Sequence, residues 1–272
     1  NLGRTGPCAK HPGLGQPLQA VSGLVHLMGW PDRGPDNPFG AIPDIIAPPF
    51  AVAALVAALD FRRRTGQGQF IDLSQFEVSC LMLAPQILDR MVNGREASRN
   101  GNRDANAAPH GVYPCLGDDR WCAIAVFTDE EWRSFSQVVG EDLIHDSRFV
   151  TFAARKAHED ELDEIVAQWT RGRTADVVMY NLQKAGVSSG VVNTPADLFD
   201  DPQLKHRQHF NVVDHPEIGP HRVTGEPSAL SATPPIVKRA PLLGEHNEVI
   251  IRDFLHMSEE EYARLVVSDV LR

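Results

Sequence analysis

Apolar residues follow a helical repeat near the start of the chain and then form one long uninterrupted run. Between residues 16 and 28 they recur at the spacing of one helix face: Leu18, Val21, Leu24, Val25 and Met28. From residue 45 to residue 59 no side chain is charged, and the arginines at 62–64 and then Gly66 follow. Cations and a glycine are typical of a helix C-terminus, so the pattern predicts a long, buried helix from Asp44 to about Arg64.

A short β-prone segment and a further helix follow. Residues 70–73, Phe-Ile-Asp-Leu, lie between turn residues and are predicted to form a strand. Ser74 and Glu77 have the spacing of a capping box, which opens a predicted helix that carries apolar residues to about residue 88. The order helix, strand, helix is typical of α/β proteins, and this is the fold class that we predict.

The middle of the chain is predicted to be a linker followed by a small domain. Residues 93–102 are polar and lack periodicity, as expected of a linker. Residues 103–200 are predicted to form a small α+β domain. It is expected to contain a hairpin of residues 111–116 and 120–127, helices at 128–140, 159–170 and 174–185, and a last strand at 187–192.

The last part of the chain is expected to return to the first. Residues 201–240 are rich in Pro, His and turn residues, with a β-like piece at 210–213. One helix is predicted around residues 249–254, and Ser258 caps another. We therefore expect residues 201–272 to form a return linker and helices that pack on a large domain built from residues 1–92.

Asp44 is the one carboxylate at the start of the apolar run, and two interpretations of it are open. The first is structural: an aspartate before an apolar helix commonly accepts hydrogen bonds from the free N–H groups of the first turn, and prolines such as those at 48 and 49 suit such a turn. The second is chemical. A carboxylate kept ionised by the helix dipole and surrounded by apolar side chains can act as a nucleophile.

Composition narrows the classes of partner. The 272 residues carry a net charge of -10, which argues against a nucleic-acid-binding surface. The apolar run is shorter than the ~20 residues that a bilayer crossing needs and contains two prolines, so no membrane segment is expected. The partners expected are small molecules or proteins.

The cysteines and the N-terminus point to a compartment. The four cysteines form no CxxC pair and no disulfide framework, and no export signal is visible, so a reducing cytoplasm is expected. The first residue is Asn1 in a Gly- and Pro-rich loop, from which we expect the chain to be part of a longer polypeptide.

Other candidate chemistry is weak. The 11 histidines are scattered, and His206 with His209 has no carboxylate partner at metal spacing, so no metal site is predicted. His246 beside Glu245 is better interpreted as a surface cap than as a general acid/base. The chain has no P-loop and no Gly-x-Ser-x-Gly elbow.

A set of short motifs, taken together, carries a family resemblance. In order they are Arg4-Thr5-Gly6-Pro7 with Pro12-Gly13, Gln19-Ala20-Val21-Ser22-Gly23-Leu24, Pro43-Asp44, Arg64-Thr65-Gly66-Gln67-Gly68-Gln69-Phe70-Ile71-Asp72-Leu73-Ser74, Asn102, Ala108-Pro109-His110-Gly111-Val112-Tyr113, Asp201-Pro202-Gln203-Leu204, and Pro241-Leu242-Leu243-Gly244-Glu245-His246. Over essentially its whole length the chain resembles the family III CoA-transferases, the group that includes formyl-CoA transferase, carnitine CoA-transferase and the α-methylacyl-CoA racemases. It resembles the C-terminal part of these proteins and lacks their N-terminal portion.

The resemblance implies a fold, a site and a reaction. It implies a partial Rossmann-like large domain, an interlocked dimer, and either a homodimer or a heteromer with a chain that carries the missing portion. It places the family's nucleophilic aspartate on Asp44 and implies contacts to the substrate or coenzyme A from Asn102, Pro109, His110 and Gly111. The implied reaction moves coenzyme A from an acyl-CoA to a carboxylic acid through an aspartyl-CoA thioester, with no permanently bound cofactor.

Two departures from the family pattern keep rival hypotheses open. Many relatives have an aromatic and then an acidic residue where this chain has Leu14-Gly15, and the racemases have a catalytic histidine at about Leu14. An acyl-CoA isomerase or racemase is therefore disfavoured, whereas a non-catalytic partner subunit stays open. Relatives that use small acids such as formate and oxalate have a run of glycines near 102–109, and the residues at 103–108 here disfavour those substrates.

Overall fold

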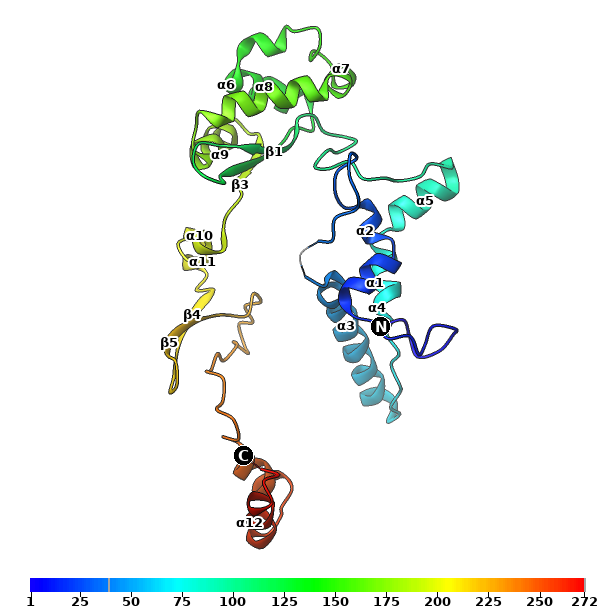
Figure 1. Cartoon of the computed structure of the whole chain (residues 1–272), viewed down its shortest axis with the longest axis vertical. Coiled ribbons are helices and arrows are strands. Elements are labelled where there is room, and N and C mark those ends of the chain that lie inside the picture. The colour runs from blue at the N-terminus through cyan, green and yellow to red at the C-terminus, as the bar shows by residue number, and fades with distance from the viewer. Residues whose placement is uncertain (39, 272) are drawn as a thin grey trace. The chain divides into compact units, whose positions relative to one another are not determined.

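The chain folds into two compact units, residues 1–192 and residues 193–272, each described here by itself (Figure 1). The structure is a computed structural model, and it describes residues 1–38 and 40–271. It contains both helices and small sheets, so the predicted mixed fold class is confirmed. The finer domain boundaries expected at residues 92, 102 and 200 stay a prediction.

Helices alone form the first part of unit 1: α1 (Gly15–Val21), α2 (Leu24–Leu27), α3 (Ile42–Thr65), α4 (Gln75–Leu81) and α5 (Ala84–Asn93). Helices α1, α3 and α4 pack side by side (Figure 1). The single helix predicted over 16–28 is wrong, because Gly23 has φ 89°, a left-handed conformation that ends one helix and starts the next. The helix predicted after Ser74 is likewise divided before Pro85, which favours a new helix start.

The long helix predicted after Asp44 is confirmed as α3. It ends at Gly66, which has φ 74° and donates its N–H to the Arg62 carbonyl at 2.8 Å. The two prolines were expected in the first turn, but Pro48 and Pro49 lie inside the helix.

The strand predicted over residues 70–73 is wrong. In the described residues from 1 to 93 the chain forms helices and loops and no strand. A strand needs a neighbouring strand to satisfy its N–H and C=O groups, and this part of the chain supplies none. Residues 67–74 lie outside any helix or strand.

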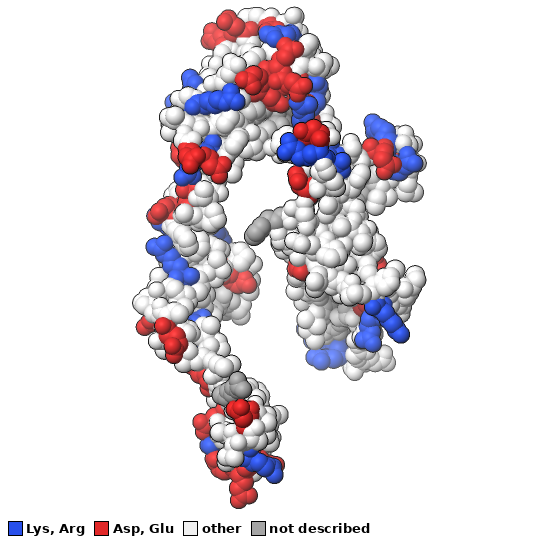
Figure 2. Space-filling model, viewed as in Figure 1, with Lys and Arg blue, Asp and Glu red and all other residues white. Residues whose placement is uncertain are grey.

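Helix α3 is not buried, contrary to expectation. Of its residues only Pro43 and Ala47 are buried, and Ile45 keeps 68% of its surface exposed. Figure 2 shows a mostly uncharged surface over α3. By length and composition alone α3 could cross a membrane, a test that the core helix of a soluble protein also passes. Within unit 1, α1 and α4 pack against α3 and leave many of its apolar side chains exposed.

The second part of unit 1 is a layer of helices on a three-stranded antiparallel sheet. The strands, in sheet order, are β1 (His110–Pro114), β2 (Trp121–Ala125) and β3 (Ser188–Val191). The helices are α6 (Asp129–Val139), the 3-10 turn η1 (Glu141–Ile144), α7 (Phe152–Ala157), α8 (Glu159–Arg171) and α9 (Ala175–Lys184). The predicted hairpin, helices and last strand are confirmed.

Local signals explain these elements. Thr128 and Glu131 form a reciprocal capping box at the start of α6, and Gly140 ends it. Alternate residues of β2 point into the core, so Cys122 and Ile124 are almost fully buried. The core of this part is built from the following side chains: Tyr113, Cys115, Cys122, Ile124, Val126, Trp132, Phe135, Leu143, Phe149, Leu162, Val166, Ala167, Ala175, Val178, Leu182 and Val187.

Unit 2 contains short elements: α10 (Pro195–Leu198), α11 (Pro202–His206), β4 (Phe210–His215), β5 (Gly219–Thr224), a π-helical turn η2 (Val249–Phe254) and α12 (Glu259–Val267). The β-like piece predicted at 210–213 is confirmed and extends into a hairpin with β5. Ser258 caps α12 with Glu261 as predicted. The Glu245 carboxylate accepts hydrogen bonds from the Leu242 N–H at 2.6 Å and from the Arg239 guanidinium, which closes the turn before η2.

Candidate functional site

Asp44 lies in the first turn of α3, where it does not act as the helix cap. The N-cap residue is Ala41, whose side chain accepts no cap hydrogen bond, and the N–H of Ile42 donates instead to Gln19 Oε1 at 3.0 Å. The Asp44 N–H itself donates to the Ala41 carbonyl at 2.9 Å. The capping interpretation of Asp44 is therefore wrong, although a carboxylate in a first turn still interacts favourably with the helix dipole.

The Asp44 carboxylate sits where α1, α3 and α4 meet. Its Oδ1 accepts a hydrogen bond from Gln75 Nε2 at 2.6 Å. On the other side it faces Gly15, the first residue of α1, where a Cβ atom would lie 2.9 Å from Asp44 Oδ2 and 1.9 Å from the Ala41 Cβ. One oxygen is thus held by an amide, and the other lies against a backbone that has no side chain.

The environment of Asp44 differs from the expected one in two respects. Asp44 is exposed, so the apolar surroundings expected to exclude water from it are absent in the described chain. Gln75 was not predicted as a site residue, because nothing in the local sequence relates two positions 31 residues apart. Its one signal is its place directly after the cap Ser74, which fixes the start of α4.

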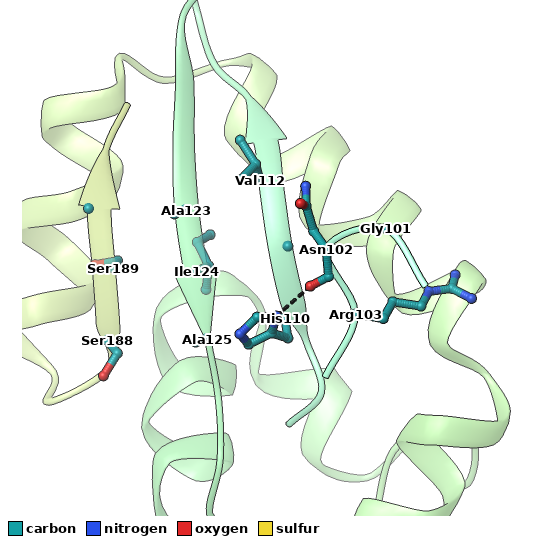
Figure 3. Close-up of a pocket in the computed structure, with 12 residues that line it drawn as sticks. Gly101, Asn102, Arg103, His110, Val112, Ala123, Ile124, Ala125, Ser188 and Ser189 are labelled. Atoms are coloured by element: carbon teal, nitrogen blue, oxygen red, sulfur yellow. Dashed lines mark hydrogen bonds between the residues drawn. The ribbon is translucent and has the colours of Figure 1, made fainter. Parts of the chain in front are cut away.

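A second group of candidate residues lines a cavity of about 480 Å³ on the sheet of unit 1 (Figure 3). Asn102 and His110 lie together on one side of it, Gly111 follows His110 in β1, and Ile124 and Ser189 come from the other two strands. His110 Nδ1 contacts the Asn102 carbonyl oxygen at 2.5 Å. Since a carbonyl oxygen only accepts, Nδ1 carries the proton there and Nε2 of a neutral ring is an acceptor.

The remaining predicted residues lie outside this cavity lining. Pro109 follows a cis peptide bond, and its carbonyl accepts the Val126 N–H at 2.9 Å, which joins the loop to the segment after β2. Asp44 is likewise not among the lining residues. The structure thus brings together three of the four predicted substrate-binding residues and leaves Asp44 in a separate group with Gly15 and Gln75.

A neighbouring cavity of about 520 Å³ shares Asn102, His110 and Gly111. Its wall includes a pair that the sequence did not reveal, in which the buried Tyr113 donates from Oη to Oδ1 of the half-buried Asp163 at 2.6 Å. Burial raises the pKa of the Asp163 carboxyl and that of the Tyr113 phenol. Tyr113 was predicted as part of a strand and of a family motif, without a contact to Asp163.

No resident metal or redox group is indicated by the described side chains. Over residues 1–38 and 40–271, no three His, Cys, Asp or Glu side chains are grouped to hold a metal ion. The four cysteines are free thiols, and burial raises the pKa of Cys122 to about 11, which disfavours its thiolate. The role of Asp44 as nucleophile stays a prediction.

Comparison with known proteins shows the family. The model of CoA-transferase family III matches residues 1–247. The chain is 33% identical over 99% of its length to a succinyl-CoA–D-citramalate CoA-transferase of Chloroflexus aurantiacus, and 30% identical over 97% to the alpha subunit of a succinyl-CoA–L-malate CoA-transferase of the same organism. It covers 67% and 62% of these two relatives, respectively.

A solved structure agrees. A CAIB/BAIF family protein from Brucella suis matches with a TM-score of 0.82 and 31% identity, over 93% of this chain and 66% of that one. The chain therefore spans about two thirds of the length of these relatives and shares their fold over nearly all of its own length. It belongs to CoA-transferase family III.

Proposed function

We propose that this chain carries the nucleophile of an enzyme that transfers coenzyme A from an acyl-CoA thioester to a carboxylic acid, and that the nucleophile is Asp44. The observation that carries the proposal is the placement of the Asp44 carboxylate. It lies at the start of α3, with one oxygen bound by Gln75 and the other against Gly15. The family resemblance implies a nucleophilic aspartate at this residue, which supports the proposal.

The reaction proposed is two exchanges at one carboxylate. A carboxylate oxygen of Asp44 attacks the thioester carbonyl carbon, the C–S bond breaks, and CoA leaves as its thiolate while Asp44 and the acyl group form a mixed anhydride. The thiolate then attacks the carbonyl carbon of Asp44, which releases the donor acid as its carboxylate and leaves an aspartyl-CoA thioester.

The second exchange reverses these steps with another acid. An acceptor carboxylate attacks the aspartyl thioester, releases the CoA thiolate and forms a second anhydride. Attack of the thiolate on the acceptor's carbonyl carbon gives the new acyl-CoA and regenerates the Asp44 carboxylate. The covalent route conserves the thioester energy if water is kept out.

Gln75 is suited to orient the nucleophile. Its amide N–H binds Asp44 Oδ1, which leaves Oδ2 as the oxygen free to attack. The same amide can donate to the acyl oxygen of Asp44 after the anhydride or thioester forms, because that oxygen keeps its acceptor lone pairs. Gln75 would thus stabilise both the carboxylate and its acylated forms.

We propose that Asn102, His110 and Gly111 line the binding site of the acyl group or of the acceptor acid. Pro109 would fix the conformation of the loop between Asn102 and His110. The cavity lining includes His110, whose Nε2 is an acceptor in the neutral ring, Ser188 and apolar side chains of the strands, whereas the Ser189 hydroxyl donates to the Met179 carbonyl at 3.3 Å. The names of the two transferases described above favour succinyl-CoA as donor and a small dicarboxylic acid as acceptor. These are the first substrates to test.

The assembly proposed is a homodimer, or a heteromer with a chain that supplies the family's N-terminal portion. It is supported by the exposed apolar side chains of α3, which need a covering partner. We propose that α3 is a core helix in that assembly and not a membrane span. Coenzyme A enters as substrate, no permanent cofactor is proposed, and free cysteines favour the cytoplasm.

A non-catalytic partner subunit is the second candidate. Gly15, in place of the family's acidic residue, favours it, as does the existence of a relative named as an alpha subunit. An acyl-CoA racemase is disfavoured, because Leu14 stands where the racemases have their histidine.

The test is transfer between succinyl-CoA and a panel of small dicarboxylic acids by the full-length protein. Asp44→Asn keeps the shape of the side chain but cannot form the anhydride, so the rate should fall at least a hundredfold, about 2.7 kcal/mol in barrier terms. Asp60→Asn removes a carboxylate from the far end of the same helix and should change the rate less than threefold. A wild type without transfer to any acid, while correctly assembled, favours the partner-subunit hypothesis.

A further inference from the structure

Two consecutive cationic residues of α7 donate hydrogen bonds to the loop that carries the candidate substrate-binding residues. Arg155 is fully buried, and its Nε donates to the Ala108 carbonyl at 3.2 Å. Lys156 donates from Nζ to the Asp104 carbonyl at 2.9 Å. The two side chains therefore hold both ends of the segment 104–108, directly between Asn102 and Pro109.

Each cation is itself fixed from the other side. The Arg155 guanidinium donates to Asp129 Oδ1 at 2.8 Å and to the Phe149 carbonyl at 3.3 Å, and its carbon lies 4.8 Å from the centre of the Trp132 ring. A buried guanidinium that uses its donors and an aromatic face in this way has little freedom to move. The hydrogen bond from Arg155 therefore holds the Ala108 carbonyl in a fixed position.

Lys156 is held by a carboxylate of the next helix. Its Nζ lies 2.7 Å and 2.8 Å from the two oxygens of Glu159, whose side chain is almost buried. Three acceptors therefore surround one ammonium group, which has three N–H donors. The Asp104 carbonyl is one of these acceptors, so Lys156 cannot leave it without losing a charge-assisted hydrogen bond.

The loop between these anchors is closed on itself. The Asn106 N–H donates to Asp104 Oδ1 at 2.7 Å, Asp104 and Ala107 form a β-bridge, and the Ala108 N–H donates to the Val126 carbonyl at 3.0 Å. Ala107 and Ala108 have no exposed surface. A glycine-rich loop would lack these restraints, since glycine adds backbone freedom.

We propose that Arg155 and Lys156 are positioning residues that hold residues 102–111 in one conformation and so select the acceptor acid. The inference rests on the proposed function of the cavity beside Asn102 and His110. Neither cation lines that cavity, so each acts through the loop and not by contact with the acid. Loosening the loop should affect the acceptor more than the thioester donor.

The experiment uses the full-length protein and the substitution Lys156→Met, which removes the ammonium and keeps an unbranched apolar stem. The expected result is a KM for the acceptor acid raised at least fivefold, with the KM for the acyl-CoA donor within twofold. Hydrogen exchange at the amides of Asn106 and Ala108 should quicken at least fivefold. Lys205→Met is the matched control, because it removes an exposed lysine paired with Asp200, and it should change none of these values.

Three outcomes contradict the proposal: an unchanged acceptor KM, an unchanged exchange rate in the loop, or equal effects of both lysine substitutions. Lys156→Gln replaces Lys156→Met should the latter fail to fold. The wild type also gives a test that does not depend on activity. Its Asn106 and Ala108 amides should exchange at least tenfold more slowly than those of residues 95–99, which lie outside any helix or strand. Equal exchange rates in the two segments would contradict the claim that the loop is held in one conformation. If the loop is protected but the wild type transfers no CoA, the proposed function alone is wrong.

Discussion

Gly15→Ala tests the contact between α1 and the candidate nucleophile. An added Cβ would lie 1.9 Å from the Ala41 Cβ, 3.0 Å from the Ala41 Cα and 2.9 Å from Asp44 Oδ2. Contacts this short cannot persist, so the start of α1 must move away from the first turn of α3. The movement alters the surroundings of the Asp44 carboxylate without changing its chemistry.

The expected magnitude follows from the overlap. Overpacking by one methyl group typically costs about 1–3 kcal/mol, because neighbours must leave favourable positions. In a domain of this size about 1 kcal/mol lowers Tm by about 2–4 °C, which gives an expected loss of about 2–12 °C. The transfer rate should also fall, since a shift of about 1 Å in a reacting group can cost a hundredfold.

The assay compares thermal unfolding and transfer rate in three variants of the full-length protein. Gly172→Ala is the control, because Gly172 has φ -85° and nothing within 4 Å of the new Cβ. Its Tm and rate should stay close to those of the wild type. The double variant Gly15→Ala/Ala41→Gly removes the 1.9 Å overlap and should recover part of both losses. If Gly15→Ala and Gly172→Ala behave alike, the packing argument is refuted.

Three further predictions concern stability. Hydrogen bonds from Arg239 and from the N–H of Leu242 lower the pKa of Glu245 from 4.5 to about 2. Their contribution to the free energy of unfolding should therefore be complete above about pH 4.5 and be lost as the pH falls towards 2. Acid unfolding of Glu245→Gln should lack this part of the pH dependence, and a profile identical to that of the wild type contradicts the prediction. Thr128→Ala removes the cap of α6 and should cost about 1 kcal/mol in urea unfolding, and a cost below about 0.3 kcal/mol would show that the cap is dispensable. His246→Gln should lower Tm more than turnover, and a hundredfold loss of turnover with unchanged Tm would assign His246 to catalysis.

The sequence predicted the elements whose signals are local. The capping box at Thr128 and the turn between β1 and β2 act within a few residues, so their pattern alone determines them. The sequence pattern was insufficient where a strand or the apolar face of a helix needs a partner from a distant part of the chain. Residues 70–73 have strand propensity but no neighbouring strand among the described residues 1–93, and α3 has apolar side chains that the rest of unit 1 leaves exposed.

The candidate site shows the same division. Asp44 stood out because a charge interrupts an apolar pattern, and Asn102 and His110 stood out through the family motif. Gln75 did not, because its contact to Asp44 depends on how α4 packs against α3. The role of Gly15 was equally hidden, since the close approach of α1 to Ala41 follows from packing and not from residue type.

Trapping the acylated enzyme tests the central claim most directly. The full-length protein is incubated with succinyl-CoA, treated with borohydride to reduce an aspartyl thioester to the alcohol, and digested for mass spectrometry. The proposed mechanism predicts that the peptide containing Asp44 shifts by the mass change from carboxylate to alcohol, and that the Asp44→Asn variant shows no shift. An unmodified Asp44 peptide from an enzyme that is turning over, or the modification on another carboxylate, would contradict the assignment of Asp44 as the nucleophile.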